Sequence, residues 1–157
     1  VFMLRKTISI ILLLLWMTVI FMFSSSGSVK SNNTSGQVIS SAISVKDKVT
    51  NNETKPETKK KIVKKLNYSV RKSAHVFEYF VLGVLALNVF DAFNVKRKVL
   101  FAIILCVLYA ASDEFHQLFT GRTASVTDVL LDSAASIVGI YLLNLIFSRR
   151  KKGRATN

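Results

Sequence analysis

Ionisable side chains recur inside the apolar parts of this sequence, at spacings that place them on helical faces. Arg71, His75 and Glu78 stand at i, i+4 and i+7 in an otherwise apolar run, so on an α-helix they line one face. A histidine beside a carboxylate can exchange protons near neutral pH, and an arginine can hold an anion. The three residues predict an acid–base or anion-binding site, unless His75 and Glu78 only satisfy each other as a buried pair.

A later apolar run ends in the charged stretch DEFHQ. On a helix, Asp113, His116 and Gln117 share one face, and Glu114 turns aside from it. The two acids and the histidine are candidates for proton transfer. Gln117 is a candidate for binding a ligand through its amide.

Two aspartates follow at the start of the last apolar run. Asp128 and Asp132 are one turn apart and share a face. Asp128 also fits a helix-capping pattern with Ser125, so capping alone explains it equally well. Asp132 already lies inside the apolar run, where capping does not explain it. Arg122, in the short connection before them, is either the ion-pair partner of an aspartate or a contact for a ligand.

Three kinds of chemistry fit this set of residues. The arginines and histidines can grip an anionic head group such as a phosphate while a carboxylate or histidine moves protons. The two histidines and the carboxylates can instead hold a divalent metal, since the i, i+3 spacing of His75 and Glu78 occurs among metal ligands in helical bundles. The sequence has no HExxH motif to support that reading. The third alternative is a structural network that braces the helices.

Four apolar runs must position these residues. A helix needs roughly 20 residues to cross a hydrocarbon core of about 30 Å. The third run is short and crosses only if its helix continues through DEFHQLF, which puts Asp113 and His116 at the end of a span. We predict an all-α polytopic membrane protein, a bundle of four transmembrane helices at about residues 7–23, 73–90, 99–119 and 128–147, in a single domain over residues 1–157.

Basic residues flank the predicted spans at 5–6, 96–98 and 149–154. The positive-inside rule places all three flanks in the cytoplasm, and with them both termini of the chain. The first run also resembles a signal peptide, but its apolar core is long and no A-x-A site follows it, so we expect a retained anchor. The ionisable residues of the other three spans then meet at the outer end. Such residues usually face each other or a water-filled cavity, which predicts an outward-facing polar pocket.

The polar connection 24–72 is expected to be mostly irregular or amphipathic-helical. Its helical periodicity is carried by Val38, Ala42, Val45 and Val49, then by Ile62, Leu66 and Val70. A basic amphipathic helix can lie in the interface of an anionic membrane. A solvated, lysine-rich tether explains the composition equally well.

The bulk composition points to a membrane protein. Half of the 157 residues are hydrophobic, the mean hydropathy is +0.38 and the net charge is +13. The lysines and arginines lie mostly beside apolar runs with few aromatic residues between them, which favours a lipid bilayer over nucleic acid as the partner. The single cysteine, Cys106, stands in an apolar run, so no disulfide forms within this sequence.

Two segments resemble the VanZ-like family of bacterial membrane proteins, which is named for a member linked to low-level teicoplanin resistance. The segments are RKSAHVFEYFVLG (71–83) and SDEFHQLFTGRTASVTDVLLDSAAS (112–136), and FMFSSS after the first run is also similar. The matched positions, spread over three of the four runs, are Arg71, Lys72, His75, Glu78, Tyr79, Asp113, Glu114, His116, Gln117, Arg122, Asp128 and Asp132.

The resemblance implies a cell-membrane protein of a Gram-positive envelope that reduces the action of glycopeptide or lipoglycopeptide antibiotics. An anionic lipid or a cell-wall precursor is the expected ligand. The catalytic candidates are His75, Glu78, Asp113, Glu114, His116 and Asp132, and the binding candidates are Arg71, Gln117, Arg122 and Asp128. A non-catalytic brace, and a membrane metalloenzyme with a divalent metal as cofactor, are the alternatives.

Overall fold

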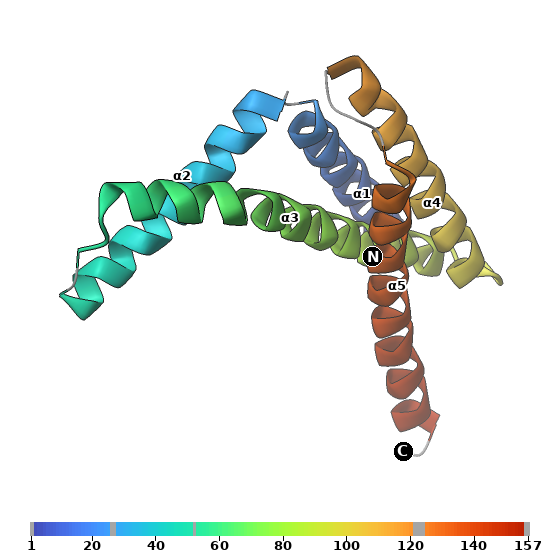
Figure 1. Ribbon diagram of the computed structural model, residues 1–157. Coiled ribbons are helices and arrows are strands. Elements are labelled where there is room, and N and C mark those ends of the chain that lie inside the picture. The colour runs from blue at the N-terminus through green and yellow to red at the C-terminus, as the bar shows by residue number, and fades with distance from the viewer. Residues whose placement is uncertain (1, 26–27, 52, 121–124, 156–157) are drawn as a thin grey trace.

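The computed structural model describes residues 2–25, 28–51, 53–120 and 125–155, and all regular structure within these ranges is helical (Figure 1). The elements are α1 (Phe2–Ser24), α2 (Ser28–Thr50), α3 (Pro56–Ala92), α4 (Lys98–Gln117), the short 3-10 helix η1 (Leu118–Thr120) and α5 (Val126–Ala155). The prediction of an all-α fold is confirmed.

Four of these helices are long and apolar enough to cross a membrane. The spans are Met3–Ser24, Pro56–Ala92, Lys98–Gln117 and Val126–Arg149. The third continues through the charged stretch DEFHQ, as the length argument requires, and its 20 residues give about 30 Å of helix. Asp113 and His116 therefore belong to the last turns of a spanning helix.

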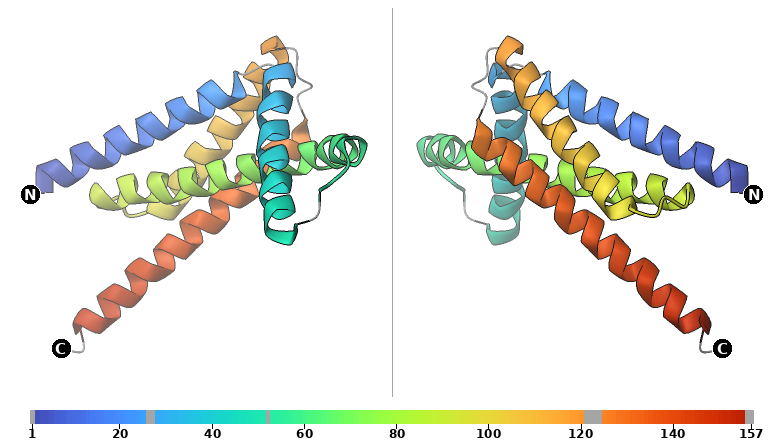
Figure 2. Two further views of the ribbon diagram at one scale, coloured as in Figure 1. Left: turned by 90° about the vertical axis from the view of Figure 1, so that its left-hand side faces the viewer. Right: turned by 90° about the vertical axis from the view of Figure 1, so that its right-hand side faces the viewer.

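The spans α1, α4, α5 and the second half of α3 form a bundle in which α3 contacts the other three (Figure 2). The core between them is apolar, and it is made by Leu13, Ile20, Tyr79, Leu82, Ala86, Leu87, Ala102, Cys106, Ala110, Ala135 and Ile140. Many large apolar side chains on α1, α4 and α5 point outward instead. Outward apolar side chains suit a bundle that is surrounded by lipid.

Helices α3 and α5 cross at glycines, with their backbones in contact. A Cβ atom on Gly83 would lie 2.2 Å from the carbonyl oxygen of Ser136, and one on Gly139 would lie 2.3 Å from the carbonyl oxygen of Phe80. The Ser136 hydroxyl donates a hydrogen bond across the crossing to the carbonyl oxygen of Tyr79 at 3.0 Å. Small residues allow this close approach, which is a common way for helices to associate within a membrane.

Both termini and the α3–α4 connection lie at one end of the bundle (Figure 2). Asp91 ties that end together, because it accepts hydrogen bonds from Arg5 of α1 and Lys98 of α4, each at 2.7 Å. At mid-bundle, the indole of Trp16 donates to the carbonyl oxygen of Glu78 at 2.9 Å. These contacts fix α1 and α4 against α3, and they leave the other end for the polar residues of the spans.

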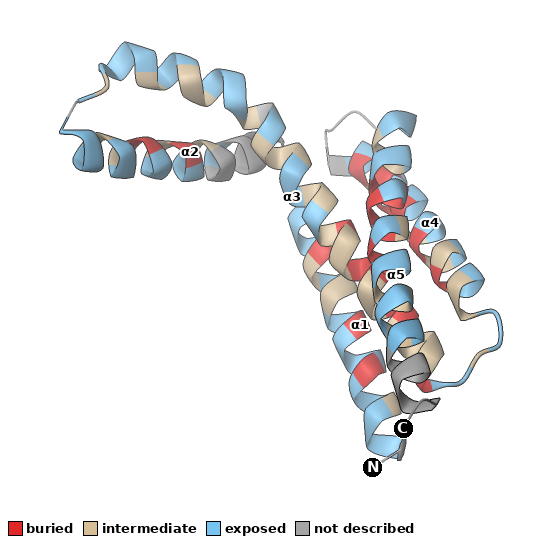
Figure 3. Ribbon diagram, turned by 90° about the horizontal axis from the view of Figure 1, so that it is seen from below, coloured by how far each residue is buried: buried red, intermediate tan, exposed pale blue. Residues whose placement is uncertain are grey.

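The connection between the first two spans is a helical hairpin. Of the two predicted alternatives, an irregular loop and amphipathic helices, the structure has helices. α2 and the first part of α3 extend sideways from the end of the bundle opposite the termini (Figure 3). α3 is one continuous helix from Pro56, so it begins several turns before the span predicted at about residues 73–90 and includes the end of the polar connection. A proline in the first turn of a helix is favourable, since its missing N–H has no partner to lose there.

The faces of this hairpin differ from the predicted stripe. Ile39 and Ile43 are buried where α2 packs on α3, and Lys59 donates to the Ser44 hydroxyl at 2.8 Å. The predicted stripe residues Val38 and Val45 are exposed. The α2 part of the apolar stripe is therefore not used for packing within the chain, and its placement in the membrane interface stays a prediction.

Candidate functional site

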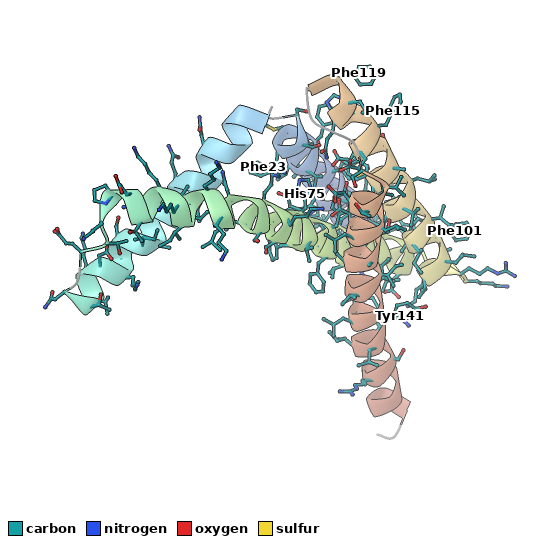
Figure 4. All side chains as sticks on the ribbon, in the orientation of Figure 1. Phe23, His75, Phe101, Phe115, Phe119 and Tyr141 are labelled. Carbon is teal, nitrogen blue, oxygen red and sulfur yellow. The ribbon has the colours of Figure 1, made fainter. Side chains whose placement is uncertain are left out.

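Ionisable residues of α3, α4 and α5 meet at the end of the bundle where α4 ends and α5 begins. His75, labelled in Figure 4, lies where α3 approaches these two helices. We call the group the polar cluster; its members are Arg71, Lys72, His75, Glu78, Asp113, Glu114, Gln117, Asp128 and Asp132. Eight of the ten residues predicted for the site are in it.

His75 lies between carboxylates of two helices. Its Nδ1 atom is 3.9 Å from an oxygen of Asp132 on α5 and 4.0 Å from an oxygen of Glu78 on α3. Asp132 is almost completely buried, at 2% exposure, and the other two side chains are largely covered. These distances suit an ion pair but are longer than a direct hydrogen bond. A small inward movement or one water molecule is enough to connect them for proton transfer.

Asp113 lies in the cluster next to Gln117 and Tyr79. One of its carboxylate oxygens accepts a hydrogen bond from the side-chain amide of Gln117 at 3.2 Å. The ring of Tyr79 is fully buried close to Asp113. Within the described ranges, the second oxygen of Asp113 and the hydroxyl of Tyr79 have no partner at hydrogen-bonding geometry. Buried polar atoms in this state call for a water molecule or a ligand.

Tyr79 was not among the predicted site residues, although a signal was present. It stands at i+4 from His75 and so on the same helical face. An aromatic residue in an apolar run is ordinarily taken as core. What makes Tyr79 a site residue is the nearby Asp113 on α4, and the sequence does not show that the two are close.

The predicted face of α4 is wrong in one respect, because Glu114 does not turn aside. Glu114 is buried, lines the cluster, and accepts a hydrogen bond from the backbone N–H of Ser125 at 2.9 Å. In a capping box the acid of the same helix makes this bond. Here an acid from α4 caps the start of α5, while Asp128 pairs with Lys72. Capping is therefore not what the Asp128 side chain does in this structure.

His116 lies on the opposite side of α4, toward α1. Its Nε2 atom is 3.2 Å from the hydroxyl oxygen of Ser25, and its ring centroid is 4.6 Å from that of Phe21. A separate pocket of about 240 Å³ opens there, lined by Phe21, Tyr109, Ser112, Asp113, Phe115, His116 and Phe119. The expectation that His116 joins His75 in one pocket is wrong, since the two rings lie on different sides of α4; Asp113 belongs to the cluster and also lines this second pocket.

The polar cluster is closed in this structure. The ion pair between Lys72 and Asp128 spans its entrance, and Arg71 lies beside it. The free space among the lining residues is about 10 Å³, which holds at most one water molecule. A larger ligand therefore requires the Lys72–Asp128 pair to separate. Lys72 is not among the site residues predicted from the sequence, and its ion pair with Asp128 adds it to the cluster.

Two predictions remain, namely the role of Arg122 and a metal site. Arg122, a binding candidate, falls outside the described residues. No group of three or more His, Cys, Asp or Glu side chains in the described ranges is arranged to hold a metal ion.

Comparison with known proteins gives the family. No curated protein and no solved structure matches the chain. The family model described as VanZ/LLP1 matches residues 9–147, which include most of all four spans and the whole polar cluster. The chain is therefore a multi-pass membrane protein that belongs to the VanZ/LLP1 family.

Proposed function

We propose that this protein binds an anionic component of the bacterial cell envelope at the polar cluster, and that it thereby reduces the action of glycopeptide antibiotics. The observation that carries the proposal is the burial of Asp132 within ion-pair distance of His75, beneath the basic residues Arg71 and Lys72. A carboxylate buried in a spanning helix is costly, and such residues are typically functional.

The cluster divides into a basic entrance and an acidic interior. An anionic head group that approaches Arg71 and Lys72 competes with Asp128 for the lysine, so binding itself opens the entrance. Behind it, His75 stands between Glu78 and Asp132 and can pass a proton to or from the bound group. The same residues therefore serve binding alone or binding followed by acid–base chemistry.

The proposal requires the cluster to face the outside of the cell. The basic flanks at 5–6, 96–98 and 149–154 support this orientation, since the positive-inside rule assigns them and both termini to the cytoplasm. Two exposed positions test it. In a Cys106→Ala background, a cysteine at Val126 is expected to react with an impermeant maleimide in intact cells, and one at Asn94 only after permeabilisation. The reverse labelling pattern would place the cluster in the cytoplasm.

The function is tested by antibiotic tolerance in a Gram-positive host that expresses the chain. His75→Gln is expected to abolish any rise in the minimal inhibitory concentration of teicoplanin, because the residue loses its titratable proton and keeps its size. His116→Gln is the matched control and should retain the rise, since that ring lies toward α1. Membrane levels of both variants are compared by immunoblot. Full protection by the His75 variant at wild-type levels would refute the proposal.

A structural brace is the second candidate function. Two contacts and one property of the cluster favour it: the Lys72–Asp128 ion pair, the hydrogen bond from the Ser125 N–H to Glu114, and the small free volume among the lining residues. Under this alternative, replacement of a buried partner costs about 3–5 kcal/mol, because the other charge is left uncompensated. Loss of function would then follow loss of folded protein, which separates the two candidates experimentally.

A further inference from the structure

An apolar groove runs along the seam between α3 and α5, within their spanning parts. Its volume is about 310 Å³, and it is lined by Ser73, Val76, Phe77, Phe80, Ala135 and Val138. Phe77 and Val138 are each about 60% exposed, so the groove is open at the side where a spanning bundle meets lipid. Its lining is almost entirely hydrocarbon, and a hydrocarbon occupant fits it best.

The groove adjoins the polar cluster on both helices. Lys72 lines the cluster and Val76, one turn further along α3, lines the groove. On α5, Leu131 and Ala135 have the same relation. A molecule lying along this seam therefore meets two basic side chains at one end and an apolar channel at the other. That is the charge and hydrophobicity pattern of an anionic lipid.

We infer that the ligand of the polar cluster is a lipid, with its anionic head group at Arg71 and Lys72 and one acyl chain in the groove. This inference rests on the proposed function and adds the class of the ligand. Residues 72 to 80 of α3 extend over about 12 Å, so several methylene groups of a chain fit beside them. A chain in the groove makes van der Waals contacts with these side chains along its length, and a soluble anion makes none of them.

The test measures binding of three probes to purified full-length protein in detergent, followed by native mass spectrometry. The probes are dioleoyl phosphatidylglycerol, dioleoyl phosphatidylcholine and the head-group analogue glycerol phosphate. Val138→Trp fills the groove from its open side. Leu145→Trp is the matched control, since it lies two turns further along the same face of α5 and is about half exposed but does not line the groove. Arg71→Gln removes one charge from the entrance.

The inference predicts that phosphatidylglycerol binds at least about tenfold more tightly than either other probe, and that Val138→Trp and Arg71→Gln each weaken it by about tenfold. Leu145→Trp should bind like the wild type. Equal binding of glycerol phosphate and phosphatidylglycerol, unaffected by Val138→Trp, would overturn the lipid inference and leave the proposed anion site standing. Equal binding of both lipids, unaffected by Arg71→Gln, would overturn the anion site as well.

Discussion

Replacement of Gly139 by alanine is expected to destabilise the bundle by about 2 kcal/mol or more, although it adds only one methyl group. The new Cβ atom would lie 2.3 Å from the carbonyl oxygen of Phe80, which belongs to the backbone of α3 and cannot rotate away. The two helices must therefore separate. Because the polar cluster is built across α3 and α5, separation would also move His75 away from Asp132. The free energy of unfolding, measured by titration with denaturing detergent, checks the prediction.

Gly36 supplies the matched control for this substitution. A Cβ atom there would lie 3.4 Å from the side chain of Val63, which is an ordinary contact distance. Alanine is more favourable than glycine in a helix by about 1 kcal/mol, so Gly36→Ala should leave stability unchanged or raise it. The same chemical change is thus expected to act with opposite sign at the two glycines. An unaltered Gly139→Ala protein would show that α3 and α5 are not in backbone contact.

The sequence predicts the spans and their polar faces well, because both depend on local regularities. The thickness of a bilayer requires the third spanning helix to continue through DEFHQ, and α4 does continue to Gln117. The i, i+4 spacing of Arg71 and His75 requires a shared face whatever surrounds the helix. The convergence of three such faces at one depth followed from the order of the spans.

Which neighbour lies on a face could not be predicted, since periodicity carries no information about packing. Glu114 and His116 flank Asp113 on the two sides of α4, and only the positions of α1, α3 and α5 decide which of them joins the cluster. The ion pair of Lys72 with Asp128 could not be predicted either, because it depends on how closely α5 approaches α3. That approach is set in turn by the small residues at the crossing, whose role shows only when two backbones are placed together.

Asp132→Asn is expected to keep the protein folded while it removes the antibiotic tolerance that we propose. Asparagine has nearly the same shape and retains a hydrogen-bonding oxygen for His75, but it carries no charge and cannot accept a proton. The buried carboxylate lies close to those of Asp113 and Glu114, so neutralising it relieves repulsion between like charges. The free energy of unfolding should therefore stay within about 1 kcal/mol of the wild type or rise.

Asp91→Asn, at the other end of the bundle, is expected to do the opposite, that is, to lower stability without removing tolerance. Asp91 pairs with Arg5 and Lys98 on two other helices and is partly exposed, so its neutralisation should lower stability by about 1 kcal/mol and leave tolerance intact at equal protein levels. The pair of variants separates a site from a brace, because a brace makes function follow stability at both positions. Loss of folded protein in the Asp132 variant would favour the brace. Normal tolerance in that variant would remove Asp132 from the site, because a ligand or a proton transferred there depends on the charge that the substitution deletes.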